Sequence, residues 1–355
     1  MRVLTLTLHR GVVLALAAAA LFGAATPAAK LLLAHVSPWM LAALLYLGSG
    51  IGLWALRAVR RADAVRLPPS EWRWLGGAIA AGGVIAPVLL MVGLAGMPAS
   101  GASLLLNAES VLTAVLAWFA FKENFDRRIL LGMAAIVAGA LVLSWPAGGA
   151  SNVVGLWPAL AVLGACLGWA IDNNLTRKVA LQDASWIAMV KGLTAGVTNL
   201  ALALATGASW PGLLSGMSAA VLGFLSYGVS LSLFVVALRE LGTARTGAYF
   251  SVAPFFGAVL SLLVLHEPLT LALIAGGVLM AVGVLLHLTE RHAHTHQHAP
   301  AEHTHEHEHG PLELHHQHTH EVPVPEGTRH SHAHRHEPLT HSHPHFPDAH
   351  HQHRH

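Results

Sequence analysis

Cysteine and charged residues are both scarce in this sequence. Its only cysteine, Cys166, excludes an intramolecular disulfide and a zinc site built from several cysteines. Asp, Glu, Lys and Arg together make up 11% of the chain, whereas soluble proteins carry about 25%. The nucleotide-binding pattern G-x-x-x-x-G-K-[ST] is also missing, which argues against an activity driven by ATP. What remains is a chain in which 54% of the residues are hydrophobic.

The hydrophobic residues are gathered into long runs. A helix needs about 20 residues to cross the hydrocarbon core of a bilayer, and most of the runs approach or exceed that length. The first run resembles a secretory signal peptide, but its counterpart later in the chain is internal, so we expect it to be retained. The sequence therefore predicts an all-α integral membrane protein with ten transmembrane helices, at residues 11–33, 38–56, 74–94, 100–121, 129–145, 155–176, 185–206, 213–238, 243–265 and 269–288.

The stretch of residues 93–143 recurs 144 positions later without a gap. The identical residues run through two apolar segments and the turn between them: Ala114, Val115, Leu116, Glu123, Gly132, Gly139 and Leu141 fall on Ala258, Val259, Leu260, Glu267, Gly276, Gly283 and Leu285. Self-similarity over so long an offset indicates a duplicated half rather than a solenoid. We therefore predict two five-helix repeats, residues 9–146 and 153–289, followed by a tail at residues 290–355.

The basic residues indicate the orientation in the membrane. With the N-terminus placed in the cytoplasm, nearly all Lys and Arg residues before the tail fall in cytoplasmic segments. Lys30 falls in an outside loop, and Lys191 falls within a span. Short cytoplasmic loops are enriched in Lys and Arg, so the pattern predicts that both termini are cytoplasmic. The expected location is the plasma (inner) membrane, as a multi-pass protein.

Each predicted half has an odd number of spans, so the second half must enter the membrane from the side opposite to the first. Inverted repeats are typical of secondary transporters, whose substrate site lies near the midplane between the halves. The segments FKENF at 121–125 and VLHEPLT at 264–270 each place a Glu in a tight turn between apolar helices, and glycines seven residues apart follow each. In these features residues 9–289 resemble the EamA-type branch of the drug/metabolite transporter superfamily. The resemblance implies the fold and a transport function, but similar proteins carry amino acids, other metabolites or drugs.

The repeated Glu and Gly residues are predicted to be structural. Glu123 and Glu267 each precede a helix, whose positive N-terminus attracts a carboxylate. Inversion puts them on opposite faces of the membrane, so they do not form one site. Gly132 and Gly139, like their counterparts in the second half, lie two turns apart on one helix face, where small residues let helices pack closely in lipid.

Glu109 is the most informative polar residue within a predicted span. It lies near the middle of the fourth span, in the segment LLLNAESVL, with Asn107 beside it. An ionisable group at that depth is costly and is by default a functional-site hypothesis. We interpret Glu109 as a substrate-binding or proton-coupling residue, with a structural hydrogen bond inside the bundle as the alternative.

A second polar group lies in the segment WAIDNNLTRK at 169–178. Asp172, Asn173 and Asn174 follow one another and sweep about 200° around the helix, so at least one faces protein or water. Lys191 enters the membrane from the same side on the next helix. It either pairs with Asp172 or extends its amine to the interface. These four residues are further candidates for substrate binding or coupling.

Three prolines and two tyrosines complete the candidate site. Pro27, Pro87 and Pro254 lie within predicted spans, where each removes a backbone hydrogen bond, frees a carbonyl and bends the helix. We predict hinges or kinks there. Tyr227 and Tyr249 are candidate hydroxyls lining a substrate cavity, and aromatic packing is the alternative for each.

The tail differs abruptly from the rest of the chain. It holds all but four of the 27 histidines, mostly in alternating H-x-H runs separated by Pro, Glu, Thr and Gln, without an apolar period. Such a composition predicts disorder. Imidazole suits Ni, Zn, Co and Cu, so the tail is expected to bind one of these ions, with a cytoplasmic proton buffer as the alternative. The candidate ligands are His292, His294, His296, His298, His303, His305, His307, His309, His330, His332, His334 and His336.

Three functions follow from these patterns. The leading hypothesis is a secondary transporter, not an enzyme, that exports a small organic metabolite or drug-like solute by alternating access and needs no cofactor. The second is efflux of Ni, Co, Zn or Cu, with the tail collecting ions. The third is a membrane-tethered metal buffer or sensor. The expected partners are the lipid bilayer and a small-molecule substrate, without nucleic acid, and the protein is expected to be a monomer or homodimer.

Overall fold

A computed structural model describes two compact units: residues up to Glu290 and residues from Arg291 onward. The described residues of the first unit are 10–62, 65, 67–121, 127–145, 156–179, 183–241, 246 and 249–288. Those of the second unit are 293–297, 301–308, 329–336 and 340–344.

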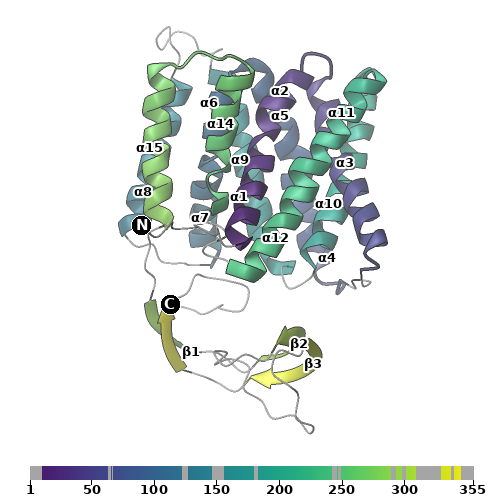
Figure 1. Ribbon diagram of the computed structural model, residues 1–355, viewed down its shortest axis with the longest axis vertical. Helices are drawn as coiled ribbons and strands as arrows, with labels where there is room; N and C mark the ends of the chain where they lie inside the picture. The colour runs from purple at the N-terminus through teal and green to yellow at the C-terminus, as the bar shows by residue number, and fades with distance from the viewer. Residues whose placement is uncertain are drawn as a thin grey trace, which may run out of the picture. The chain divides into compact units, whose positions relative to one another are not determined.

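The described part of the first unit is a bundle of helices (Figure 1). Long apolar runs with few charges form helices because every backbone hydrogen bond is then satisfied within the segment, as a bilayer requires. The helices of the first half are α1 (Arg10–Gly23), α2 (Ala25–Leu32), α3 (Pro38–Val59), α4 (Trp72–Ala78), the π-helix η1 (Ile79–Ile85), α5 (Ala86–Gly96), α6 (Ala99–Leu105), α7 (Ala108–Phe121) and α8 (Arg127–Ser144). Those of the second half are α9 (Trp157–Thr176), the 3₁₀-helix η3 (Arg177–Val179), α10 (Ala184–Ala205), α11 (Leu213–Gly223), the π-helix η4 (Phe224–Val229), α12 (Ser230–Leu241), α14 (Ala253–Val264) and α15 (Leu271–Leu288).

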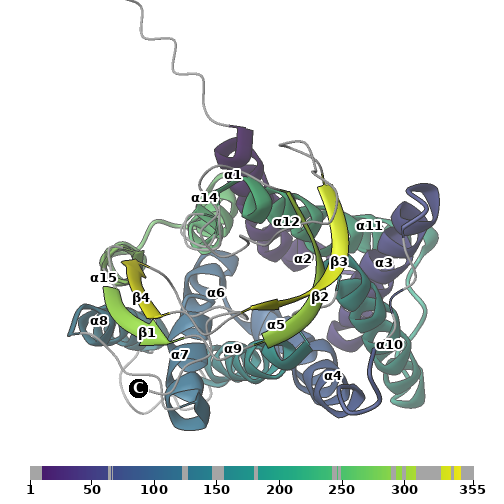
Figure 2. The same cartoon turned by 90° about the horizontal axis from the view of Figure 1, so that it is seen from below.

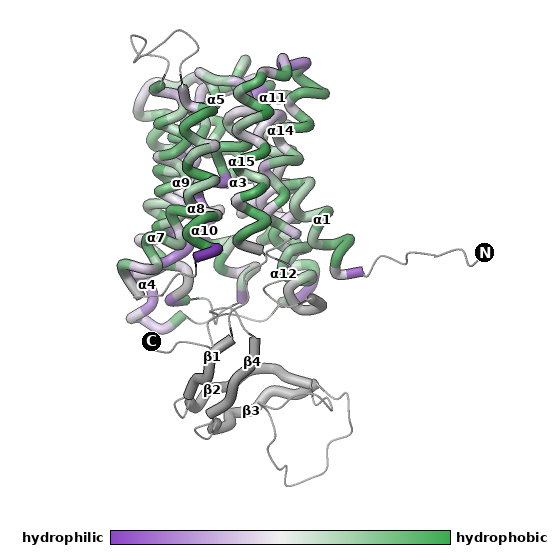
Figure 3. The backbone as a smooth tube through the Cα atoms, turned by 90° about the vertical axis from the view of Figure 1, so that its left-hand side faces the viewer, coloured by the Kyte–Doolittle hydropathy of each residue, from purple (hydrophilic) through white to green (hydrophobic). Residues whose placement is uncertain are grey.

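These helices confirm the predicted fold class. Among the described residues, seven helical stretches are long and apolar enough to cross a membrane: Arg10–Leu32, Pro38–Val59, Trp72–Gly96, Ala99–Phe119, Arg127–Ser144, Ala184–Ala205 and Leu213–Ala237. The other predicted spans correspond to α9, which carries the polar run at 172–174, and to the shorter apolar helices Ala253–Val264 and Leu271–Leu286. Apolar residues occupy the middle of the helices, and hydrophilic residues gather toward their ends (Figure 3).

Two helix pairs join equivalent helices of the two halves. The offset of 144 carries α3 onto α10 and α8 onto α15, and each pair packs closely along its length. Figure 2 shows the two pairs on opposite sides of the bundle. The repeated glycines make the α8–α15 contact, as predicted: a Cβ on Gly283 would lie 2.6 Å from the carbonyl oxygen of Gly132, and one on Gly139 would lie 2.9 Å from that of Gly276.

Helix irregularities also recur in both halves. The offset carries η1 onto residues 223–229, which overlap η4 at Phe224–Val229. The fourth span is interrupted at Leu106 and Asn107, between α6 and α7, and its counterpart has a turn at Ser251 and Val252 just before α14. π-Helical segments and interrupted helices are frequent at functional sites because they leave backbone groups without helical partners.

The two ends of the bundle differ in charge. One end, called here the basic end, carries Arg10, Arg57, Arg127 and Lys178 at helix termini. The other, called the opposite end, carries Lys30 at the end of α2. The first half begins at the basic end and the second half begins at the opposite end, so the halves are inverted (Figure 1).

The described residues of the second unit lie in four short segments. They form four strands, β1 (Ala293–Gln297), β2 (Ala301–Glu308), β3 (Arg329–His336) and β4 (Thr340–Pro344). β1 pairs with β4 and β2 with β3, both antiparallel. The alternating H-x-H pattern has the period of two that suits an extended strand, although the alternating positions are not apolar.

Candidate functional site

Glu109 stands at the start of α7, directly after the interruption of the fourth span. Asn107 forms hydrogen bonds on both sides of this interruption. Its side-chain amide donates to the Leu104 carbonyl at 2.9 Å, and its backbone carbonyl accepts from the Ser110 hydroxyl at 2.8 Å. Glu109 therefore lies in the first turn of a helix, whose N-terminal dipole favours a carboxylate. Its side chain is partly exposed, whereas Asn107 is buried.

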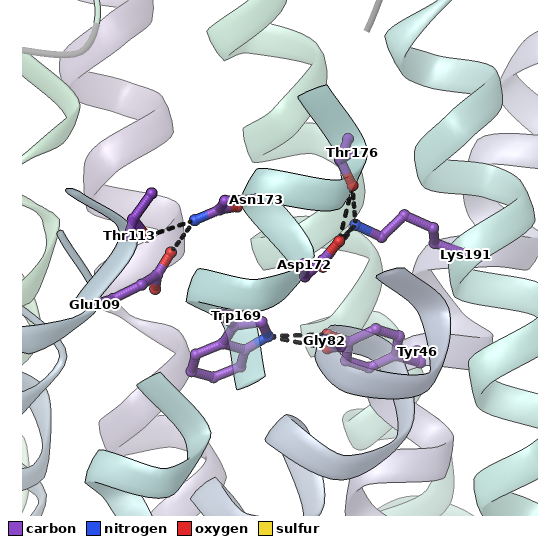
Figure 4. A network of polar contacts seen from close by, with 9 residues as sticks. All are labelled: Tyr46, Gly82, Glu109, Thr113, Trp169, Asp172, Asn173, Thr176 and Lys191. Carbon is purple, nitrogen blue, oxygen red and sulfur yellow. Dashed lines mark hydrogen bonds and ion pairs between the residues drawn. The ribbon is translucent and has the colours of Figure 1, made fainter. Parts of the chain in front are cut away.

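The predicted asparagines of α9 contact this region. Asn173 Nδ2 donates to the Glu109 carboxylate at 2.9 Å and lies 3.4 Å from the Thr113 hydroxyl, as Figure 4 shows. Asn174 Nδ2 donates to the Thr113 carbonyl at 3.2 Å and to the Ala170 carbonyl at 2.8 Å. Two consecutive asparagines thus join α9, from the second half, to α7, from the first.

Asp172 points to the other side of α9 and forms an ion pair with Lys191 of α10. The Lys191 ammonium lies 2.5 and 2.6 Å from the two Asp172 oxygens and 3.3 Å from the Thr176 hydroxyl (Figure 4). The side chains of Asp172 and Lys191 are 7% and 19% exposed, so of the two alternatives for Lys191 the structure has the pair with Asp172 inside the bundle. Gly82 in η1 makes room for the carboxylate, because a Cβ there would clash with it.

Removing one member of this pair is expected to destabilise the protein strongly. Lys191→Met leaves the Asp172 carboxylate buried without a counter-charge, which costs about 3 to 5 kcal/mol in buried pairs. Thermal unfolding of the purified protein in detergent should show a large drop for Lys191→Met. The control is the double variant Asp172→Asn with Lys191→Met, which removes both charges and should recover most of the loss. A double variant as unstable as the single one would contradict this account.

Pro87 explains a cluster of residues that the sequence did not single out. It lies in the first turn of α5, after η1, and a proline cannot donate to the carbonyl four residues earlier, that of Gly83. The buried Asn199 supplies that hydrogen bond from α10 at 3.0 Å. The neighbouring Gly82 carbonyl accepts from the Tyr46 hydroxyl at 2.9 Å and from Trp169 Nε1 at 3.0 Å (Figure 4).

The remaining predicted residues are two prolines and two tyrosines at separate places in the bundle. Pro27 lies in α2, just after the interruption of the first span at Ala24, which fits a kink. Pro254 lies in the first turn of α14 rather than within a helix, since the turn at 251–252 precedes it. Tyr227 lies in η4, with its ring centroid 5.7 Å from that of Tyr46. Tyr249 is partly buried, and none of the described contacts brings it into the network around Glu109.

Glu267 caps a helix, but not the one that follows it. Its carboxylate accepts from the backbone N–H groups of Ala99 at 2.7 Å and Ser100 at 2.9 Å, at the start of α6 in the other half. The following helix, α15, is capped instead by Thr270. The prediction of a structural carboxylate at a helix N-terminus chose the wrong helix, because the turn folds back toward α6. Glu123 lies outside the described residues.

Lys30 caps the neighbouring helix end. Its ammonium donates to the carbonyl oxygens of Leu94 at 2.6 Å, Met97 at 2.9 Å and Ala95 at 3.2 Å, where α5 ends. A cation is favoured at a helix C-terminus, where carbonyls lack helical partners. The sequence carried no motif for this contact, because all three acceptors are backbone atoms.

At the basic end, Asp183 caps α10. It accepts from the backbone N–H groups of Ser185 at 2.8 Å and Trp186 at 3.0 Å, and it lies 2.9 Å from the Arg57 guanidinium of α3. Burial raises the pKa of Asp183, but the hydrogen bonds from Ser185 and Arg57 outweigh burial and bring its pKa below the usual value. The ion pair requires the ionised form, and the negative charge also strengthens the cap.

The predicted metal ligands divide between described and undescribed residues. Within the described residues, no group of three His, Cys, Asp or Glu side chains is placed to hold a metal ion. Of the tail histidines, His292, His298 and His309 lie outside the described residues. The register of β2 with β3 pairs histidine with histidine in backbone position: His303 with His334, His305 with His332 and His307 with His330.

Sequence comparison matches this chain to transporters. Residues 9–145 and 156–289 each match the EamA-like transporter family. An uncharacterized transporter of Methanothermobacter thermautotrophicus is 27% identical over 282 residues, which cover 75% of this chain and 82% of the relative. Probable amino-acid metabolite efflux pumps of Salmonella typhimurium and Escherichia coli are 25% and 26% identical over 205 residues, 54% of this chain and 68% of theirs. A crystal structure shares the fold, with a TM-score of 0.60 and 18% identity over 78% of this chain and 95% of that one.

Proposed function

The chain belongs to the EamA-like transporter family, and from this premise we propose that it is a secondary transporter that exports a small organic solute by alternating access. Two of its relatives are named as probable amino-acid metabolite efflux pumps, which makes amino acids and their derivatives the first solutes to test. The basic end is proposed to face the cytoplasm of a cell with this protein in its plasma membrane.

A difference between equivalent contacts at the two ends carries the proposal. At the opposite end, α2 packs against both α5 and α6. The offset carries α2 into α9 and α5 into α12, but among the described helices the contact between α9 and α12 at the basic end is weaker than that between α2 and α5. We interpret this difference as two unlike conformations of the inverted halves, with the opposite end closed and the basic end open. Exchange of these conformations is what alternating access requires.

The polar side chains between the halves are placed to serve such a cycle. Asn173 and Ser110 are exposed and Glu109 is partly exposed, although all three lie on helix stretches that cross the bundle. Asp172 is neutralised by Lys191, while Glu109 has an amide as its hydrogen-bond partner. Glu109 is thus the acid in this network available to bind a proton or the amino group of a solute.

Transport into sealed vesicles tests the proposal. The purified protein is reconstituted in liposomes that contain a pH-sensitive dye, and amino acids, their derivatives and cationic dyes are added one at a time. The proposal expects proton movement that depends on a particular solute and on the protein. Liposomes with Glu109→Gln, which is expected to fold but to lose proton coupling, serve as the control for nonspecific leak. If no solute in the panel moves protons or accumulates across the membrane, the proposed function fails.

The paired histidines favour a second, separate activity: we propose that the tail binds transition-metal ions. In both small sheets histidine stands opposite histidine, with His294 paired to His343 and His296 to His341 in β1 and β4. Neutral imidazole is a good ligand for Zn, Cu, Ni and Co. We assign this activity to the tail because the tail carries the paired histidines.

Replacing the tail histidines should separate the two activities. In the full chain, changing the six paired histidines of β2 and β3 to asparagine is expected to lower the number of Zn ions bound, because it removes half of the twelve candidate ligands and adds none. Calorimetric titration of the full chain measures this loss. Solute-driven proton flux should stay at the wild-type rate. If the variant lost both its zinc binding and its solute-driven proton flux, the result would instead support the metal-efflux hypothesis.

A further inference from the structure

Lys30 and Glu267 bind the same short segment from two sides. The segment runs from Leu94, at the end of α5, through Met97 and Pro98 to Ser100, at the start of α6. Lys30 holds its carbonyl groups and Glu267 holds its N–H groups. Lys30 therefore binds the C-terminal end of α5, and Glu267 binds the N-terminal end of α6. These two contacts together are called the clamp.

The clamp joins the two halves of the molecule. Lys30 and the 94–100 segment belong to the first half, while Glu267 belongs to the second, 167 and 168 positions away from the residues it binds. The chain turns sharply just before Glu267, because His266 has a φ of 54°, in the left-handed region.

We infer that Lys30 and Glu267 hold the opposite end of the transporter closed and must release the 94–100 segment for that end to open. This inference rests on the proposed function, since only a protein with alternating access needs the end to open. Charge-assisted hydrogen bonds are among the stronger polar contacts, yet they break without disturbing apolar packing, so they suit a contact made in one state and lost in the other. Lys30 and Glu267 act as positioning residues and need not touch the solute.

Thiol labelling measures whether the end is closed. Cys166→Ser removes the only native thiol, and Ser103→Cys places a new one on α6, where Ser103 is fully buried in the closed structure. A membrane-impermeant maleimide is then added from the side of the opposite end. In this background Lys30→Met and Glu267→Gln are each expected to raise the labelling rate about tenfold, because each loses its charge-assisted contacts to the segment.

A matched control separates end opening from general loosening. Asp183→Asn removes the charge of another helix-capping carboxylate, but at the basic end, and should leave labelling of Ser103→Cys within twofold. Size-exclusion chromatography checks that each variant is folded. Unchanged labelling in folded Lys30→Met and Glu267→Gln, or an equal rise in Asp183→Asn, would overturn the inference.

The outcome is independent of the test of transport. If the wild-type protein moves a solute in vesicles but the two variants do not open the end, only the assignment of Lys30 and Glu267 is wrong. If the wild-type protein moves nothing, the proposed function fails whatever the labelling shows.

Discussion

Glu109→Gln is expected to abolish proton-driven accumulation of the transported solute. The amide has nearly the shape of the carboxyl group and keeps an oxygen that accepts from Asn173, so the fold and the α7–α9 contact should persist. It cannot take up and release a proton. With one proton exchanged per solute, a gradient of one pH unit sustains a concentration ratio of about ten, and the variant should fall to a ratio of about one.

Two measurements make this result specific. Exchange of labelled for unlabelled solute without a pH gradient should continue in Glu109→Gln, since it requires binding and movement but no coupling. Glu109→Asp keeps an ionisable group one methylene shorter and should retain part of the accumulation. Wild-type accumulation in Glu109→Gln would show that the proton travels elsewhere, and loss of exchange as well would assign Glu109 to solute binding.

Gly48→Leu is expected to destabilise the protein so strongly that most of it no longer folds. Gly48 of α3 and Gly223 at the end of α11 meet where the two helices cross: a Cβ on Gly48 would clash with the carbonyl of Ala220, and one on Gly223 with that of Leu45. Both obstacles are backbone, which cannot rotate away, so the helices must separate. Overpacking by a few methylenes costs about 1 to 3 kcal/mol when side chains can shift, and more is expected here.

The control for this prediction is a glycine with open space around it. A Cβ on Gly76 of α4 would meet nothing within 4 Å, so Gly76→Leu introduces the same side chain without a clash. The folded fraction after detergent extraction, measured by fluorescence-detected size-exclusion chromatography, should fall at least about tenfold for Gly48→Leu and little for Gly76→Leu. Similar yields for the two variants would show that the α3–α11 crossing adapts more than its geometry suggests.

The sequence predicted what depends on local composition. Span positions followed from the length of apolar runs, and the duplication and its inversion followed from the offset and the odd number of spans. The depth of Lys191 and Asp172 on neighbouring helices indicated a pair, although the sequence left open whether Lys191 reached the interface. The spacing of the glycines on one face indicated close helix packing, although it did not identify α8 and α15 as the partners.

The contacts that the sequence missed depend on three-dimensional neighbours. Pro87 predicted a freed carbonyl, but nothing marked Asn199, Tyr46 and Trp169 as the donors near it, since they lie on other helices. Glu267 was assigned to the helix next in sequence, while its partners lie in the other half. Backbone acceptors and donors carry no sequence signature, so contacts to them require the folded chain.

The helix pairs α3–α10 and α8–α15 have a consequence for how such a molecule is assembled. Each pair joins a helix to its own counterpart, so each surface is complementary to an inverted copy of itself. A five-helix chain that inserted into the membrane in both orientations would meet its twin along the same two seams. The present chain is thus organised as an antiparallel dimer whose subunits have been fused, and fusion frees the halves to diverge, as the different residues at positions 30 and 174 illustrate.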